Sequence, residues 1–196
     1  MNYLGHLYFS NNDTELMYAN LFGDFVKGPN LSMYPDKIRQ GIKLHRLIDQ
    51  YIDEHPVVLD LLHQLYEPLP KIAGIAVDLY FDHILAKKWE SYHNIPLEKF
   101  VHNFYRHTKD LEQFDKPMFH FVLSKMKENN WLLNYRDISG LERACKGLSQ
   151  RISFDNDLAI APDVYLKNEV HINHAFEEFM KDAIPFFEKY HLELPQ

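Results

Sequence analysis

The stretch from Gly41 to Asp53, GIKLHRLIDQYID, decides the fold that we predict for this chain. With the residues just before it, it places five side chains at spacings of four, three, four and three: Ile38, Ile42, His45, Asp49 and Ile52. That rhythm is typical of one helix face turned toward a core. A plain core would have Leu or Val in place of the His and the Asp, because burying an unpaired neutral polar group costs roughly 2–7 kcal/mol. The sequence therefore predicts a partner that compensates both side chains.

Two more predicted helices carry polar residues on an apolar face. The helix predicted over 72–89 has Asp82 and His83 on its inner stripe, and the helix predicted over 15–26 has Asp24 among its apolar positions. We predict that these polar side chains meet those of the first helix and hold a metal ion. Mixed imidazole and carboxylate ligands suit Mn²⁺, Fe²⁺ or Zn²⁺, whereas an all-oxygen set would suit Mg²⁺ or Ca²⁺.

The short apolar segment that opens the chain adds another imidazole. The predicted inventory on inward faces is then His6, Asp24, His45, Asp49, Asp82 and His83. The alternative is a buried network of ion pairs and hydrogen bonds, in which Lys43, Arg46 or Tyr hydroxyl groups compensate the same residues. The sequence pattern leaves both interpretations open.

The composition limits the fold class. A chain of 196 residues with 46% hydrophobic content can bury one sizeable core and is short for two domains, so we predict a single domain over 1–196. Seven Gly are few for a β-sandwich or a Rossmann fold, which use Gly in turns and phosphate loops. The prediction is an all-α, single compact multi-helix domain with about eight to ten helices.

The remaining helices are predicted from apolar periodicity and from the Pro residues that stand near helix starts and ends. Their expected ranges are 35–55, 57–66, 97–111, 118–127, 131–135, 141–152 and 164–190. The last range is expected to be one long helix or one kinked at Pro185.

Charge and cysteine content bear on location and partners. The single Cys145 excludes an intramolecular disulfide and a multi-Cys zinc site, and it favours a reducing, cytoplasmic setting. The opening MNYLGHLYFSNND does not resemble a signal peptide, and no apolar run approaches the ~18 residues of a membrane span. A net charge of −7 argues against non-specific binding to nucleic acid. We expect a cytoplasmic protein with neither a membrane nor a nucleic acid as partner.

Five blocks of the sequence resemble, in the same order, those of the bacterial acyl carrier protein phosphodiesterase family. They are MNYLGHL (1–7), GDFVKG (23–28), GIKLHRLID (41–49), DLYFDHILAKKW (78–89) and WLLNYRD (131–137). Gly5 and Gly23 stand where the family usually has Ala, which we expect to change packing rather than chemistry. The family is regarded as a helical, divergent relative of HD-domain phosphohydrolases, so the resemblance implies an HD-domain-like fold. No His-Asp dipeptide occurs in this chain.

The resemblance implies an activity and a set of site residues. The implied reaction is a metal-dependent hydrolysis that removes 4′-phosphopantetheine from holo acyl carrier protein and leaves the apo form. Carried over by position, the resemblance implies Asp24, His45, Asp82 and His83, with His6 in addition, as metal ligands. Our own hypothesis for the mechanism makes Asp24, Asp49, Arg46 and Lys27 the catalytic residues. The metal expected first is Mn²⁺, with Mg²⁺, Fe²⁺ and Zn²⁺ as alternatives.

Within that implied reaction we expect distinct roles for the charged residues. Asp24 or Asp49 would act as general base or bridge the metal, and Lys27, Lys43 or Arg46 would neutralise charge on the phosphate oxygens. Carrier proteins are acidic, so docking is expected to use basic surface residues. The candidates are Lys37, Arg39, Lys87 and Lys88.

Two alternative functions remain open at this point. One is an HD-type phosphohydrolase that acts on a nucleotide or another small phosphodiester. The other is a non-catalytic helical protein that binds a carrier protein.

Overall fold

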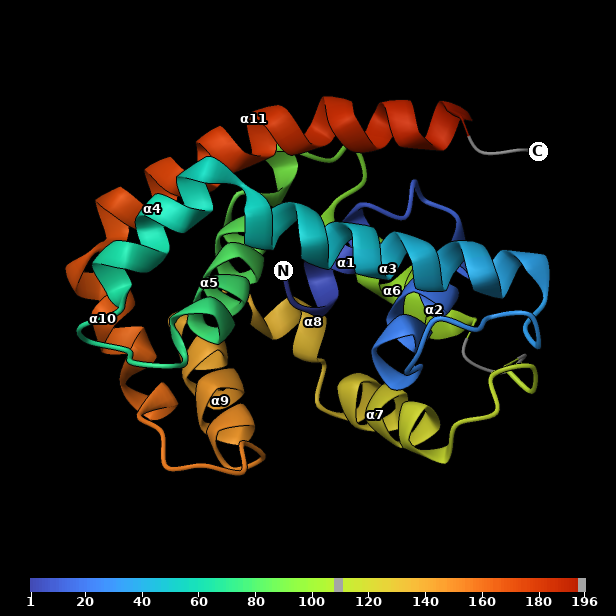
Figure 1. The fold of residues 1–196 in the computed structure, drawn as a ribbon, viewed down its shortest axis with the longest axis horizontal. Helices are drawn as coiled ribbons and strands as arrows, with labels where there is room; N and C mark the ends of the chain where they lie inside the picture. The colour runs from blue at the N-terminus through green and yellow to red at the C-terminus, as the bar shows by residue number, and fades with distance from the viewer. Residues whose placement is uncertain (108–110, 194–196) are drawn as a thin grey trace.

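The computed structural model describes residues 1–107 and 111–193, and across these residues the regular structure is entirely helical (Figure 1). The α-helices are α1 (Tyr3–Tyr8), α2 (Thr14–Phe22), α3 (Asp36–Glu54), α4 (Pro56–Leu65), α5 (Ala73–Lys87), α6 (Leu97–Arg106), α7 (Pro117–Glu128), α8 (Trp131–Asn134), α9 (Ile138–Ser149), α10 (Ala161–Lys167) and α11 (Glu169–Glu193). Short 3₁₀ helices are η1 (Gly23–Phe25), η2 (Trp89–Ser91) and η3 (Leu158–Ile160). The all-α prediction is confirmed. None of these helices, in the part of the chain described, is long and apolar enough to cross a membrane.

The helix expected over 164–190 is divided at Asn168. The backbone N–H of Asn168 donates to Val164 O and Tyr165 O, which ends α10, while its carbonyl accepts from Ile172 N, which begins α11. Pro185 lies inside α11, and the helix continues through it. The helix expected over 97–111 ends at Arg106 in the structure. Positions 108–110 of that prediction lie outside the described residues.

Helices α2 and α3 lie unusually close together because small residues face each other. A Cβ placed on Gly41 would come within 2.2 Å of Ala19 Cβ and 2.6 Å of Asn20 N. Such distances are far below van der Waals contact, so only Gly permits this approach. The close packing brings the end of α2 against the middle of α3, where His45 lies.

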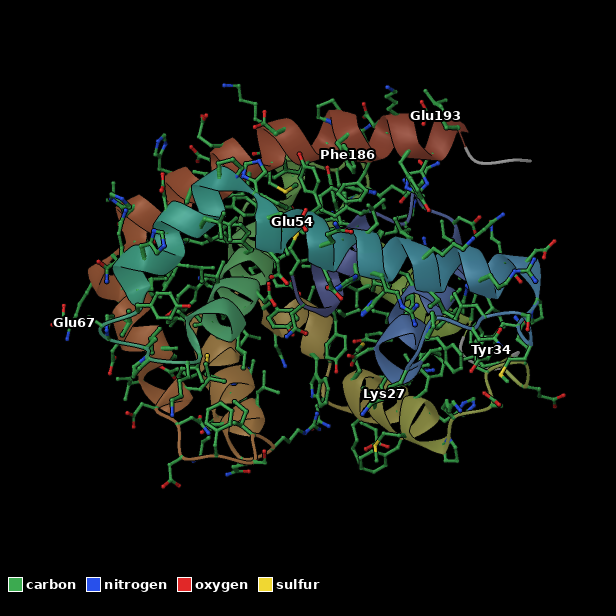
Figure 2. The ribbon with its side chains drawn as sticks, in the orientation of Figure 1. Lys27, Tyr34, Glu54, Glu67, Phe186 and Glu193 are labelled. Atoms are coloured by element: carbon green, nitrogen blue, oxygen red, sulfur yellow. The ribbon has the colours of Figure 1, made fainter. Side chains whose placement is uncertain are left out.

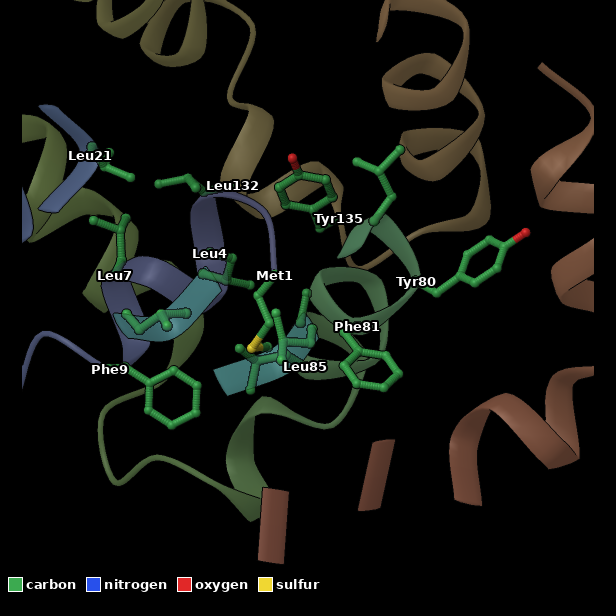
Figure 3. Packing of buried hydrophobic residues seen from close by; sticks show 14 of the residues in the cluster. Met1, Leu4, Leu7, Phe9, Leu21, Tyr80, Phe81, Leu85, Leu132 and Tyr135 are labelled. Atoms are coloured by element: carbon green, nitrogen blue, oxygen red, sulfur yellow. The ribbon is translucent and has the colours of Figure 1, made fainter. Parts of the chain in front are cut away.

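Buried hydrophobic residues from most of the helices form one connected cluster. Figure 3 shows part of it, including Leu4 and Leu7 of α1 and Phe81 and Leu85 of α5. The long helices α3 and α11 run along one side of the molecule (Figure 1). Tyr51 of α3 stacks on Phe186 of α11 with ring centroids 4.4 Å apart. Of the predicted site residues, His6, Asp82 and His83 are buried against this core, whereas Asp24 and Lys27 are exposed.

Candidate metal centre

A cleft of about 420 Å³ opens between α1, η1, α3 and α5. Its charged and imidazole-bearing lining residues are His6, Asp24, His45, Asp49, Asp53, Asp78 and Met1, whose N-terminal ammonium pairs with Asp78 Oδ1 at 2.6 Å. This ammonium offsets the charge of Asp78, and the other three carboxyl groups together with two imidazoles form a site that attracts cations.

Three of these side chains come close enough to share one ion. Asp49 Oδ1 lies 3.2 Å from His6 Nε2, and Asp49 Oδ2 lies 3.3 Å from His45 Nε2. One ligand atom from each of the three residues lies within 4.8 Å of the others. The carboxylate of Asp49 thus contacts both imidazoles, which come from helices far apart in the sequence.

The hydrogen bonds of Asn20 fix which nitrogen of His6 carries its proton. Asn20 Nδ2 donates to His6 O at 2.9 Å and to Ser10 Oγ at 3.0 Å, so its Oδ1 is the atom that faces His6 Nδ1 at 3.0 Å. His6 Nδ1–H therefore donates to Asn20 Oδ1. In a neutral ring this leaves the lone pair on Nε2, directed at the Asp49 carboxylate. Two acceptors 3.2 Å apart require a proton or a cation between them.

His45 is suited to the neutral form that binds metals. Burial lowers its pKa to about 3, with further lowering by His6 and opposition from Asp49. Its Nδ1 atom is buried and has no hydrogen-bond partner. Metal-binding histidines usually donate a hydrogen bond from the nitrogen opposite the metal. His6 has that supporting bond and His45 lacks it, so packing has to hold the ring of His45.

That packing involves Gly23. A Cβ placed on Gly23 would lie 2.5 Å from His45 Cβ and 2.7 Å from its Cγ. On the other face, the ring of His45 stacks on that of His6 with centroids 4.2 Å apart. The imidazole of His45 is held between the 3₁₀ turn η1 and His6, so the Gly at position 23 bears directly on the site and not on general packing alone.

Asp24 lies in η1, at the solvent side of the cleft. Removal of water on its protein side is the main cause of its raised pKa; His6 opposes the shift and Asp49 adds to it. For Asp49, burial would raise the pKa, but hydrogen bonding and charge from His6, followed by His45, bring it below its usual value. The two carboxyl groups therefore differ: Asp49 favours the ionised form and Asp24 holds a proton more readily.

Asp82 lies outside the group that surrounds Asp49. It is fully buried, and its carboxylate accepts hydrogen bonds from Leu4 N at 2.7 Å, Gly5 N at 3.0 Å and Asn2 N at 3.1 Å. These are the unpaired N–H groups at the start of α1, whose positive dipole end also favours a carboxylate. We therefore replace the expectation that Asp82 is a metal ligand: it holds α1, and with it His6, in place.

His83 also lies outside the group. Its Nδ1 donates to Tyr135 O at 2.7 Å, and its ring meets Tyr165 edge to face. His83 thus links α5 to the end of α8. Asp82 and His83 are expected from the sequence to give two ligands to one ion. Their side chains instead point in different directions, because neighbouring residues on a helix project about 100° apart.

Two predicted catalytic cations lie away from the cleft lining. Arg46 donates to Val26 O at 3.1 Å and to Gly28 O at 2.8 Å, so it anchors the segment that follows Asp24. Lys27 is exposed on the side of the molecule near α7 (Figure 2). Neither lines the cleft.

Sequence reasoning missed Asp53, Asp78 and the role of Asn20. Asp53 follows Asp49 by four residues and Asp78 precedes Asp82 by four, so helical spacing offered a signal for both. Burial and Asp78 together raise the pKa of Asp53. For Asn20 the sequence offered its position on a buried helix, without any indication of its partner.

The basic residues expected to dock an acidic partner are each engaged within the chain. The ion pairs are Lys37–Asp13, Arg39–Asp36, Lys87–Glu169 and Lys88–Glu177. Each pair has no net charge, so these residues give the surface no local excess of positive charge. These four residues do not form a free basic face.

The comparisons with known proteins all indicate the same family. The sequence profile described as acyl carrier protein phosphodiesterase matches residues 1–183. A protein of that name from Photorhabdus laumondii subsp. laumondii is 27% identical over 154 residues, covering 77% of each chain. One from Salmonella agona is 28% identical over 152 residues, covering 77% of this chain and 79% of the relative. No solved structure matches this chain significantly, so the HD-domain-like relationship stays a prediction. With a match over 183 residues, the chain belongs to the acyl carrier protein phosphodiesterase family.

Proposed function

We propose that this protein hydrolyses the phosphodiester that joins 4′-phosphopantetheine to a serine of holo acyl carrier protein, and that it uses a divalent ion held by His6, His45 and Asp49. The family and the names of the relatives support the reaction. The observation that carries the metal proposal is the Asp49 carboxylate, which faces a nitrogen of each imidazole at 3.2 and 3.3 Å.

The donor set fits a first-row divalent ion, with Mn²⁺ as the first choice. Two imidazole nitrogens and a carboxylate suit Mn²⁺, Fe²⁺ and Zn²⁺ better than Mg²⁺, which prefers oxygen ligands throughout. Asn20 orients His6, and the low pKa of His45 keeps that ring neutral. When bound, such an ion supplies positive charge to the phosphate oxygens and promotes ionisation of a water molecule.

The remaining cleft residues supply proton transfer. The water oxygen bonds to phosphorus while the bond from phosphorus to the serine oxygen breaks. Asp24, whose pKa is raised and which faces Asp49 across the cleft, accepts the proton of the attacking water. The departing serine oxygen takes up a proton, and we assign its donation to Asp53, a cleft residue whose pKa is raised by burial and by Asp78 against the lowering effect of the N-terminal ammonium.

Intact mass measurement of holo acyl carrier protein tests the reaction. Incubation with this protein and Mn²⁺ should remove the mass of phosphopantetheine, and a chelator should abolish the loss. Asp49→Asn should bind Mn²⁺ at least about tenfold more weakly in calorimetric titration and release no arm. An unchanged mass with Mn²⁺, Mg²⁺, Fe²⁺ and Zn²⁺ alike would remove the carrier-protein assignment. A cytoplasmic location remains part of this proposal.

A further inference from the structure

A second pocket of about 280 Å³ adjoins the metal cleft. The two share Asn2, Tyr3 and Leu148 in their linings, so they meet at the start of α1 and the end of α9. Ligand pockets in proteins are typically about 300–1,000 Å³, so a narrow ligand segment fits here. We call this second space the arm pocket.

The arm pocket differs from the metal cleft in its chemistry. Its lining includes two arginines, Arg143 and Arg151, and no Asp or Glu among the described residues. Trp131, Tyr135 and Leu79 provide apolar surface, and Asn129 and Asn134 add side-chain amides. Asn129 Nδ2 and Asn134 Nδ2 already donate to backbone carbonyl groups, which leaves the two amide oxygens as acceptors. A ligand chain that alternates apolar segments with amide N–H groups matches such walls.

Tyr3 stands at the junction of the two spaces. Its ring stacks on Trp131 with centroids 6.2 Å apart. Burial and Asp24 raise its pKa to about 12, while Arg151 acts in the opposite direction, so the phenol lies within the influence of both charges. Arg151 in turn lies 5.9 Å from the centre of the Trp131 ring. A substrate phosphate at this junction would have the carboxylates of the cleft on one side and the Arg151 guanidinium on the other.

We propose that the arm pocket binds the pantetheine portion of the substrate, so that the phosphodiester rests beside Tyr3 at the edge of the metal cleft. This inference rests on the proposed function. Pantetheine is an uncharged chain with two amides, two methyl groups and a terminal thiol. In the substrate, the phosphate is attached to the end of this chain opposite the thiol. The apolar and amide-bearing walls match the chain, and Arg151 at the junction matches the phosphate.

Gly147 offers a way to fill the pocket without disturbing the fold. It lies in α9 and lines the pocket, and a Cβ placed on it meets nothing within 4 Å. Leu has a higher helix propensity than Gly, so Gly147→Leu should fold and extend its side chain into the open space. Gly74 of α5 is the matched control because its added Cβ also meets nothing within 4 Å and it lines neither space.

Pantetheine itself, titrated without metal, gives a readout that is independent of activity. Trp131 lines the pocket, whereas the other tryptophan, Trp89, is fully buried elsewhere. Pantetheine should change the fluorescence of the wild type and of Gly74→Leu in a saturable manner. The change should be lost in Gly147→Leu and in Trp131→Phe. A saturable change that persists in Gly147→Leu would overturn the inference.

Kinetics with two substrates separates this inference from the proposed function. With holo acyl carrier protein, Gly147→Leu should raise KM by at least about tenfold and Gly74→Leu should not. With bis(4-nitrophenyl) phosphate, which has no pantetheine arm, both variants should act like the wild type. If the wild type releases the arm and Gly147→Leu has an unchanged KM, the assignment of pantetheine binding to the arm pocket is wrong and the proposed function stands. If the wild type releases no arm, the proposed function fails and the role of the pocket in it fails too.

Discussion

The imidazole rings of His6 and His45 stack with their centroids 4.2 Å apart and their planes inclined by 19°. Two protonated imidazoles at this distance would repel each other strongly, and burial lowers the pKa of His45 to about 3. The pair therefore offers at least one neutral nitrogen to a cation. Asp49 lies against both rings and supplies the negative charge.

Replacement of Asn20 should weaken metal binding through His6. Asn20→Leu removes the acceptor of His6 Nδ1–H, so the ring is no longer held with its Nε2 lone pair toward Asp49. Loss of such a supporting bond typically lowers metal affinity by about 10–100-fold. Calorimetric titration with Mn²⁺ measures this change in affinity. Ser10→Ala is the comparison: it removes the bonds from Ser10 to His6 O and from Asn20 Nδ2 to Ser10 but leaves the Asn20 Oδ1 acceptor of the ring, so its Mn²⁺ affinity should fall less than that of Asn20→Leu. Equal affinity in Asn20→Leu would contradict the assigned orientation of His6.

A methyl group at position 23 should displace His45. In Gly23→Ala the new Cβ would meet His45 Cβ at 2.5 Å, so the imidazole or the 3₁₀ turn must move. We expect Mn²⁺ affinity to fall by about tenfold or more, since metal sites tolerate little displacement of a ligand. Gly74→Ala, with no neighbour near its added Cβ, should retain the affinity and raise the free energy of unfolding by up to about 1 kcal/mol. Wild-type affinity in Gly23→Ala would show that η1 shifts without moving the ring.

Asp82 should contribute to stability whether or not metal is present. Asp82→Ala leaves the N–H groups of Leu4 and Gly5 buried without acceptors, at about 1–3 kcal/mol for each. Denaturant unfolding in the presence of a chelator should therefore still show a loss of at least about 2 kcal/mol. A metal ligand would behave differently: its removal would cost stability only when the ion is bound. Stability equal to wild type under chelation would refute the capping role.

The same carboxyl group should make stability depend on pH. Burial raises the pKa of Asp82 to about 6, above its ordinary value of 3.8. Between these two values the folded state binds more protons than the unfolded state, so the free energy of unfolding that this group contributes falls as pH rises and is constant above about pH 6. The difference in the free energy of unfolding between wild type and Asp82→Asn, followed from pH 4 to pH 7, isolates the contribution of this carboxyl group. A difference that stays constant over that range would rule out the raised pKa.

The sequence alone determined the all-α class and the face of α3 that points inward. Ile38, Ile42 and Ile52 are buried, and His45 and Asp49 project from the same side into the cleft. This was accessible because residues four apart on one helix must share a face whatever packs against it. The five sequence blocks likewise indicated the family, which the match over residues 1–183 confirms.

Only the tertiary structure decided which polar residues meet. His6 joins His45 and Asp49 because Asp82 fixes the start of α1 and because Gly41 lets α2 approach α3 closely. Asp82 and His83 looked equivalent in the sequence, yet one turns to backbone N–H groups of α1 and the other to Tyr135 O. Periodicity gives the direction of a side chain relative to its own helix. It does not give the rotation and distance of one helix relative to another, which are set by packing between residues remote in sequence.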